Sequence, residues 1–272
     1  MLVHHASSGI ARPARVPIRL VLFRPEVTRG GLAIESFADS HFQFIVDSMQ
    51  RMSSVDQPDS PESLERRACA QWTVPVLRYP ADEAHATALA LRDGGIGIVE
   101  LTMTTPGVFD IARSLVERGV TVGIGTVTEP ASVQQAAEAG ASFVVSFCLP
   151  DGFLSAAREA ELLAIPGVFT PQECYRAVQG GARWVKIFSV RSGGPDHLRD
   201  LAPVLPSLQF MVSGGIGVSQ EQLRPWHEAG AGLVAVGPEL GTVGTVGAAE
   251  VTARAVELTR VRDSLRTGTT AR

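Results

Sequence analysis

Lysine and cysteine are both scarce in this 272-residue sequence. Lys186 is the only lysine, so all the other basic residues among the 24 Lys and Arg are arginines. The three cysteines are an odd number and form no CxxC pair, which argues against a disulfide scaffold and a structural zinc site. A reducing, cytoplasmic location is therefore expected. The sequence also has no run of about 18 apolar residues that would span a membrane.

Positive charge is not in excess, because 28 acidic residues outweigh the basic ones and give a net charge of -4. This balance argues against nucleic acids and acidic membranes as partners and favours a small molecule. The six histidines include no HxH or HExxH spacing, so we expect no metal site and no cofactor. The length, the 45% hydrophobic content and the 27 glycines suit one large, turn-rich α/β domain.

The first 60 residues differ from the rest of the chain, since they show no sustained helical or strand period. The polar, proline-containing segment 53–63 connects them to the rest of the chain. We predict that 1–60 is an N-terminal extension, either poorly ordered or a misassigned start, because Met49 and Met52 lie just before that segment. We expect the main domain at 61–258 and a C-terminal tail at 259–272.

From Val74 onward, eight short apolar runs alternate with helical segments, most of which end in glycine. Glycine is favoured there because it enters the left-handed conformation at a helix end without a Cβ clash. Apolar strands alternating with helices indicate a parallel α/β fold, and eight units predict a (β/α)8 TIM barrel. The expected strands are 74–78, 96–102, 120–126, 142–147, 163–169, 183–188, 209–215 and 232–237.

Polar residues near the C-terminal ends of these strands are the candidate site, because active sites of such barrels gather there. Two of them, Lys186 and Glu100, are charged residues inside apolar runs, where burial of a charge is energetically unfavourable. The others are Arg78, Thr102, Thr104, Thr126, Ser146, Ser213, Gly214, Gly215 and Gly237.

Lys186 is the strongest candidate for catalysis. A buried lysine can be merely structural if it is paired with an acid, but arginine serves that role better, and this chain uses arginine elsewhere. Formation of a Schiff base is a task that arginine cannot perform. Glu100 is then either the partner that neutralises a buried cation or a general acid and base. Both alternatives predict that Lys186 and Glu100 are in contact.

The remaining candidates suit the binding of a substrate. Arg78 and Thr126 offer a guanidinium and a hydroxyl to a small carboxylate. The glycines of 213–217 and 235–240 occupy positions where many barrels bind phosphate through backbone N–H groups. Cys148 follows the fourth expected strand, but no histidine is placed to activate it, so we interpret it as a packing residue.

Several motifs resemble those of the KDPG/KHG aldolase family. They are GGIGIVELTMTTP, VGIGTVTEP, AGASFVVSF, IPGVFTPQE, WVKIF and SGGIG followed by AVG, in the family's order and spacing. The resemblance implies a metal-independent class I aldolase that cleaves a 2-keto-4-hydroxy acid to pyruvate and an aldehyde. It implies that Lys186 forms the Schiff base, that Glu100 is the acid and base, and that Thr126 binds the carboxylate. It also implies a homotrimer.

The sequence departs from the family's pattern at a few positions. Thr104 stands where many members have arginine, although others have threonine there and an arginine equivalent to Arg78. Ser189 and Phe147 replace prolines, and Glu239 replaces a phosphate-binding serine. A carboxylate in that place would repel phosphate. The alternatives are therefore a related Schiff-base lyase or decarboxylase acting on a non-phosphorylated keto acid, or a non-catalytic carboxylate-binding barrel.

Overall fold

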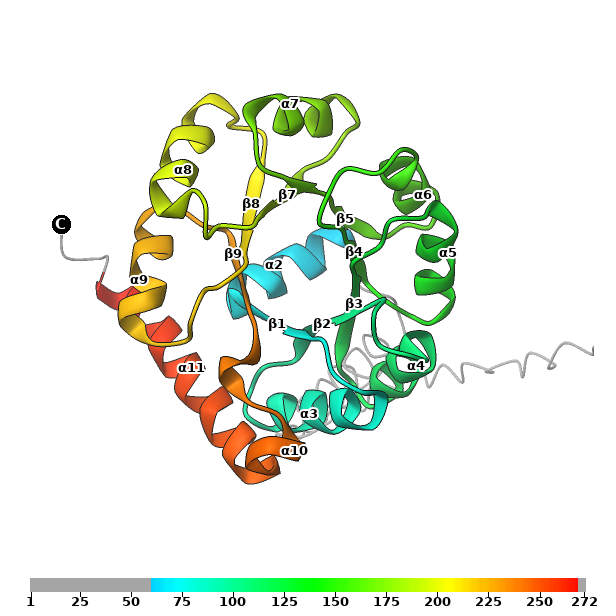
Figure 1. Ribbon diagram of the computed structural model, residues 1–272, viewed down its shortest axis with the longest axis vertical. Coiled ribbons are helices and arrows are strands. Elements are labelled where there is room, and N and C mark those ends of the chain that lie inside the picture. The colour runs from blue at the N-terminus through cyan, green and yellow to red at the C-terminus, as the bar shows by residue number, and fades with distance from the viewer. Residues whose placement is uncertain (1–59, 269–272) are drawn as a thin grey trace, which may run out of the picture. The chain divides into compact units, whose positions relative to one another are not determined.

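The computed structural model describes residues 60–268 of the chain (Figure 1). The predicted extension 1–60 lies outside these residues except for Ser60, as do residues 269–272. All statements below concern the described range.

Nine parallel strands form the centre of the fold and confirm the predicted barrel (Figure 1). Their order around the sheet is β5-β4-β3-β2-β1-β9-β8-β7-β6. Each of the eight predicted runs contains strand residues. The strands are β1 (Thr73–Leu77), β2 (Ile98–Thr102), β3 (Thr121–Gly125), β4 (Phe143–Val145), β5 (Leu163–Ile165), β6 (Gly167–Val168), β7 (Trp184–Phe188), β8 (Gln209–Ser213) and β9 (Leu233–Val236).

The fifth predicted strand is split into β5 and β6 by Pro166. Proline has no backbone N–H and cannot donate within a sheet, so a run that contains it is interrupted. Strand β5 pairs with β4, while β6 pairs with β7. The Pro166 carbonyl still accepts a hydrogen bond of 2.8 Å from the Lys186 N–H. One stretch of chain thus joins the two ends of the sheet and closes the barrel.

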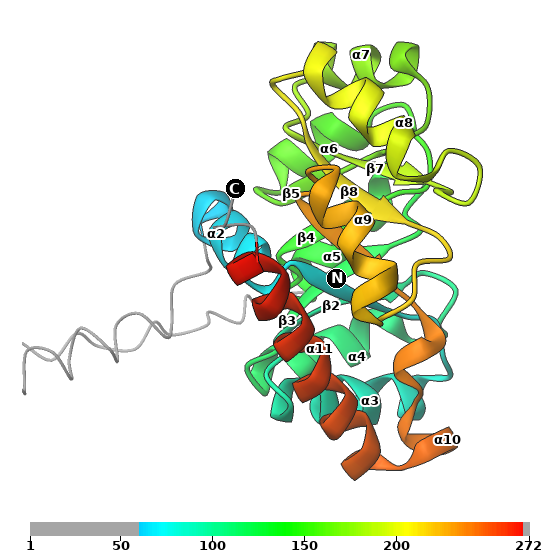
Figure 2. The same cartoon turned by 90° about the vertical axis from the view of Figure 1, so that its left-hand side faces the viewer.

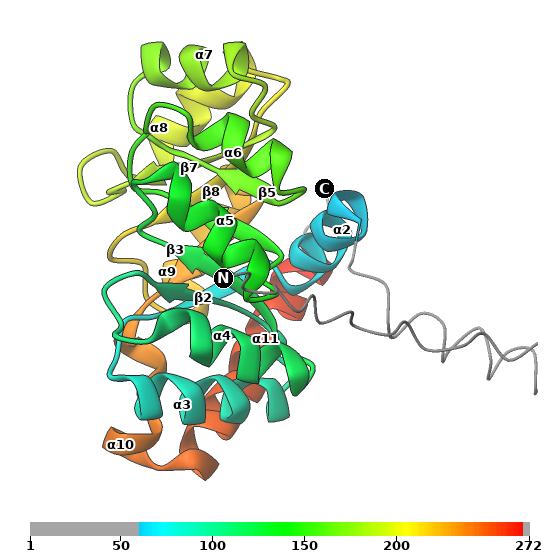
Figure 3. The ribbon, with the colours of Figure 1, turned by 90° about the vertical axis from the view of Figure 1, so that its right-hand side faces the viewer.

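Helices lie outside the strands and enclose the barrel (Figures 1 and 3). Apolar side chains of the helices pack on the outward faces of the strands as the main core. Helix α7 begins with a capping box, in which the Thr170 side chain accepts from the Glu173 N–H and Glu173 accepts from the Thr170 N–H. The helices around the barrel are α3 (Ala81–Asp93), α4 (Val108–Glu117), α5 (Pro130–Glu138), α6 (Phe153–Glu159), α7 (Pro171–Gln179), α8 (Gly194–Leu201) with η1 (Ala202–Val204), α9 (Gln220–Glu228), η2 (Pro238–Leu240), α10 (Val243–Val246) and α11 (Ala248–Gly268).

Helix α2 (Pro61–Gln71) covers the N-terminal end of the barrel (Figures 1 and 2). Its Leu64 and Ala68 are buried in a second apolar cluster formed by the inward side chains of the strands. Gln71 fixes the helix to the sheet, since its amide donates to the Thr73 and Ile98 carbonyls and accepts from the Ile98 N–H. With this end covered, the interior is open to ligands at the C-terminal ends of the strands.

Helix α11 extends the domain beyond residue 258, where we expected a tail to begin. Leu258 and Leu265 are both buried on its inner face, and the Arg266 side chain donates to the Cys69 carbonyl of α2. Helix α11 also packs against α3. This burial explains why residues 259–268 remain helical.

Candidate active site

Lys186 and Glu100 meet inside the barrel. Each is the middle residue of a five-residue strand, β7 and β2 respectively. Residues two apart on a strand share a face, and the neighbours Trp184 and Ile98 belong to the interior cluster, so Lys186 and Glu100 also point inward. Lys186 is 6% exposed and Glu100 0%. The Lys186 Nζ lies 3.4 Å from each Glu100 carboxylate oxygen, which is the contact that the sequence predicted.

The neighbouring strand β3 leaves room for the Glu100 carboxylate because residue 125 is glycine. Gly125 pairs with Thr102 in the sheet. A Cβ on Gly125 would lie 1.9 Å from Glu100 Oε1, a distance at which the carboxylate would have to move. Gly125 therefore allows the Glu100 carboxylate to lie beside the Lys186 amine.

Arg78, Thr104 and Thr126 form a second cluster at the C-terminal ends of β1, β2 and β3. The Arg78 guanidinium donates to the Thr104 hydroxyl at 3.3 Å and to the Thr126 hydroxyl at 3.2 Å. Thr102, which is buried, hydrogen-bonds Thr104 at 2.8 Å. Thr126 has a φ of 63°, and such left-handed conformations in non-glycine residues concentrate at functional sites. This cluster is suited to hold a carboxylate.

A cavity of about 340 Å³ opens above Lys186 and extends over β1, β9, β8 and β7. A volume of this size suits a small organic ligand. The predicted site residues that line it are Arg78, Lys186, Ser213, Gly214, Gly215 and Gly237. These six residues therefore line one cavity, and their role in binding a substrate stays a prediction.

Ser146 is buried on the other side of the barrel and does not line this cavity. Its hydroxyl accepts the Cys148 N–H at 3.3 Å, so it orders the turn after β4. Thr104 and Thr126 do not line the cavity either, but both accept hydrogen bonds from Arg78, which does line it.

Sequence reasoning missed two polar residues of the cavity wall, Tyr79 and Arg191. Burial, followed by the negative charges of Glu83 and Glu239, raises the pKa of the Tyr79 phenol. Arg191 lies in the loop after β7, beyond the strand end that defined the candidates. The position of Arg191 over the loop after β8 depends on the fold of the loop after β7. No spacing in the sequence indicates that fold.

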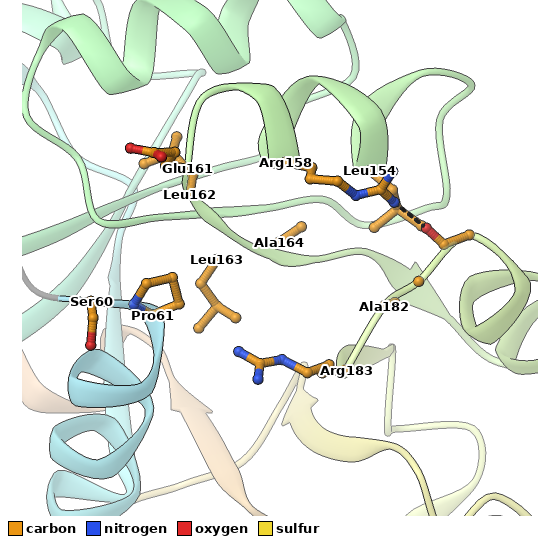
Figure 4. Close-up of a pocket in the computed structure, with 12 residues that line it drawn as sticks. Ser60, Pro61, Leu154, Arg158, Glu161, Leu162, Leu163, Ala164, Ala182 and Arg183 are labelled. Atoms are coloured by element: carbon orange, nitrogen blue, oxygen red, sulfur yellow. Dashed lines mark hydrogen bonds between the residues drawn. The ribbon is translucent and has the colours of Figure 1, made fainter.

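A second, larger cavity of about 560 Å³ lies at the opposite end of the barrel (Figure 4). Ser60, Pro61, Leu163 and Arg183 are among the residues around it. Leu163 begins β5 and Arg183 precedes β7, so this cavity faces the N-terminal ends of the strands. No predicted site residue lines it. This cavity is therefore separate from the predicted site.

Within residues 60–268, no group of three or more His, Cys, Asp or Glu side chains is arranged to hold a metal ion. Over the same residues, the helices are too short or too polar to cross a membrane.

The comparison with protein families identifies one match over most of the described residues. The family model described as "KDPG and KHG aldolase" matches residues 65–256. A 2-dehydro-3-deoxy-phosphogluconate aldolase of Pseudomonas aeruginosa is 35% identical over 133 residues, which cover 48% of this chain but only 60% of that protein. The enzyme of the same name from Dickeya dadantii is 32% identical over 160 residues, or 57% of this chain and 75% of that one.

A solved structure shares the fold as well. It is the 2-keto-3-deoxy-6-phosphogluconate aldolase of Zymomonas mobilis ZM4 with 3-phosphoglycerate, and it superposes with a TM-score of 0.65 at 26% identity. The superposition covers 72% of this chain and 94% of that one.

Proposed function

Because the chain belongs to the KDPG and KHG aldolase family, we propose that it is a class I aldolase. It cleaves a 2-keto-4-hydroxy acid to pyruvate and an aldehyde through a Schiff base on Lys186. The observation that carries this proposal is the buried contact between the Lys186 Nζ and both Glu100 carboxylate oxygens, at 3.4 Å each.

Schiff-base formation begins when the Lys186 Nζ attacks the ketone carbon C2 of the substrate. The attacking nitrogen must lose a proton, and the Glu100 carboxylate is the base within reach. Glu100 then returns the proton to the carbinolamine hydroxyl, which leaves as water. Arg78, held by hydroxyls on β2 and β3, orients the keto acid by binding its carboxylate.

Cleavage of the C3–C4 bond follows from the positive charge of the iminium. Glu100 accepts the proton of the 4-hydroxyl group, the aldehyde departs, and the electrons of the broken bond form an enamine on Lys186. Protonation of C3 by Glu100 and hydrolysis of the resulting iminium release pyruvate and restore the amine. One carboxylate can serve each proton transfer because it lies 3.4 Å from the nitrogen that carries the substrate.

The distal end of the cavity favours a substrate without phosphate. Glu239 lines the wall where the resemblance places a phosphate-binding serine. Two negative groups at this position would repel each other. We also propose, from the family resemblance, a homotrimer in the cytoplasm that needs no metal or organic cofactor.

Trapping of the Schiff base tests the proposal. Incubation with pyruvate and borohydride should reduce the iminium to a stable secondary amine, which peptide mass spectrometry should locate on Lys186. The variant Lys186→Arg keeps the positive charge but cannot form the adduct. Absence of the adduct in the wild-type protein would refute the mechanism.

A further inference from the structure

Two aromatic side chains are exposed at the C-terminal rim of the barrel, close to Lys186. Phe147 follows β4 and is 46% exposed, and Phe188 ends β7 and is 43% exposed. Large apolar groups that are exposed together mark a surface that binds another apolar group. The mechanism proposed above uses neither ring. Phe147 is also a departure from the family's motif, since it stands in place of a proline.

Gly167 brings the backbone of Phe147 next to Lys186. It begins β6 and pairs with Lys186 in the sheet, so the Cβ positions of both residues face the interior of the barrel. A Cβ on Gly167 would lie 2.1 Å from the Phe147 carbonyl carbon and 2.4 Å from the Cys148 nitrogen. The Gly167 N–H also donates to the Cys148 carbonyl at 2.8 Å. The Phe147–Cys148 peptide therefore occupies the space beside Lys186 that a side chain of residue 167 would fill.

The Phe188 ring lies near the amine. Lys186 and Phe188 are two residues apart on β7 and share a face of the strand. The Lys186 Nζ is 5.9 Å from the centroid of the Phe188 ring, and this ring lines the cavity above Lys186. A substrate joined to Nζ would thus have the ring of Phe188 beside it.

The two phenylalanines are separated by the width of one strand. Gly167 hydrogen-bonds the chain after β4 on one side and pairs with β7 on the other. Neighbouring strands lie about 4.8 Å apart, so the backbones of Phe147 and Phe188 are about 10 Å apart. Aromatic rings pair at centroid distances of about 5 Å and more, so one further flat ring fits between them. Gly167 has no side chain that would fill this gap.

The gap lies on the side of Lys186 that is remote from Glu239. In the strand order, β6 is on one side of β7, and β8 and β9 are on the other. Phe147 does not line the cavity over β8 and β9. Residues 146–150 read Ser-Phe-Cys-Leu-Pro and include no charged side chain. A carboxylate or phosphate placed between two phenyl rings would lose water without gaining a partner, whereas an apolar ring would gain contacts.

We propose that Phe147 determines specificity by stacking on an aromatic group at C4 of the substrate, with Phe188 on the other face of that group. The preferred substrates are then 2-keto-4-hydroxy acids with an aryl group on C4. Cleavage of C3–C4 gives pyruvate and an aromatic aldehyde, while the electron pair forms the enamine on Lys186 and Glu100 takes the 4-hydroxyl proton. This inference rests on the aldolase function proposed above.

The test uses 2-keto-4-hydroxy acids that carry a phenyl, cyclohexyl or methyl group on C4. Pyruvate release gives kcat/KM for each acid in the wild type and in Phe147→Leu, which keeps an apolar side chain but removes the ring. Loss of one ring pair should lower kcat/KM for the phenyl acid by roughly 2- to 10-fold. The values for the cyclohexyl and methyl acids should fall by less than about 2-fold, because neither group stacks on a ring. Comparing each acid between the two proteins removes differences in its intrinsic reactivity.

A matched control and a measurement of molar mass separate this role from a structural one. Tyr175 is an aromatic residue of α7 that is 53% exposed, so Tyr175→Leu should alter none of the three values. Light scattering should give the same molar mass for the wild type and Phe147→Leu. An equal loss on all three acids, no loss on the phenyl acid, or a smaller assembly in Phe147→Leu would overturn the inference.

Trapping with pyruvate and borohydride distinguishes this failure from failure of the proposed function, because pyruvate has no group at C4. A wild-type adduct on Lys186 together with no selective loss on the phenyl acid contradicts only the role of Phe147. Absence of any wild-type adduct contradicts the aldolase mechanism itself.

Discussion

Removal of one partner of the Lys186–Glu100 pair should destabilise the barrel strongly. At 3.4 Å and an effective dielectric constant of about 20, the attraction between the two charges is about 5 kcal/mol. The side chains are only 7% and 1% exposed, so water cannot solvate the charge that remains. Lys186→Met and Glu100→Gln should each lower the free energy of unfolding by about 3–5 kcal/mol.

The double variant should cost much less than the sum of the two single changes, because it leaves no unpaired charge. Urea denaturation of all four proteins should therefore give a coupling energy of roughly 3 kcal/mol or more. The exposed pair Arg113–Asp110 is the control, since its atoms are closer, at 2.8 Å, yet its coupling should stay below about 1 kcal/mol. Additivity of the buried pair within about 0.5 kcal/mol would refute the reasoning.

Two further substitutions test the parts that surround the pair. Gly125→Ala should displace the Glu100 carboxylate and lower kcat by about 100-fold. Gly97→Ala is the control and should leave kcat unchanged, because a Cβ on Gly97 would meet no atom within 4 Å. Similar values of kcat in the two variants would contradict this role of Gly125. Leu64→Ala should remove apolar contacts of α2 inside the barrel and lower the free energy of unfolding by about 2–5 kcal/mol. Arg66 is exposed on the same helix, so Arg66→Ala should change the free energy of unfolding by less than about 0.5 kcal/mol. Denaturant unfolding measures both values.

The barrel could be predicted from the sequence because strands covered on both faces produce continuous apolar runs, and glycines mark the helix ends between them. The split of the fifth strand at Pro166 could also have been anticipated, because proline lacks the N–H that a sheet requires. The continuation of α11 past residue 258 could not, since it depends on burial of Leu265 against parts of the chain that are distant in sequence.

The contact between Lys186 and Glu100 was predictable for a related reason. Lys186 and Glu100 are costly in buried strands, so their presence in apolar runs signals a pair or a function. Arg191 carries no such signal, because an arginine in a loop is common and only the fold brings it over Gly215. The sequence alone thus identifies charged residues that are buried in strands. It misses charged residues whose position depends on loop geometry.

The same difference separates the residues of the site that lie in strands from those that lie in loops. The proposed catalytic residues lie within β2 and β7, where sheet register fixes them. The departures from the family's motifs, Phe147, Ser189 and Glu239, follow the ends of β4, β7 and β9, as Arg191 also follows β7. Loops accept substitutions that strands do not. Substitutions in these loops can therefore alter the cavity wall while Lys186 and Glu100 keep the geometry that the proposed Schiff-base chemistry requires.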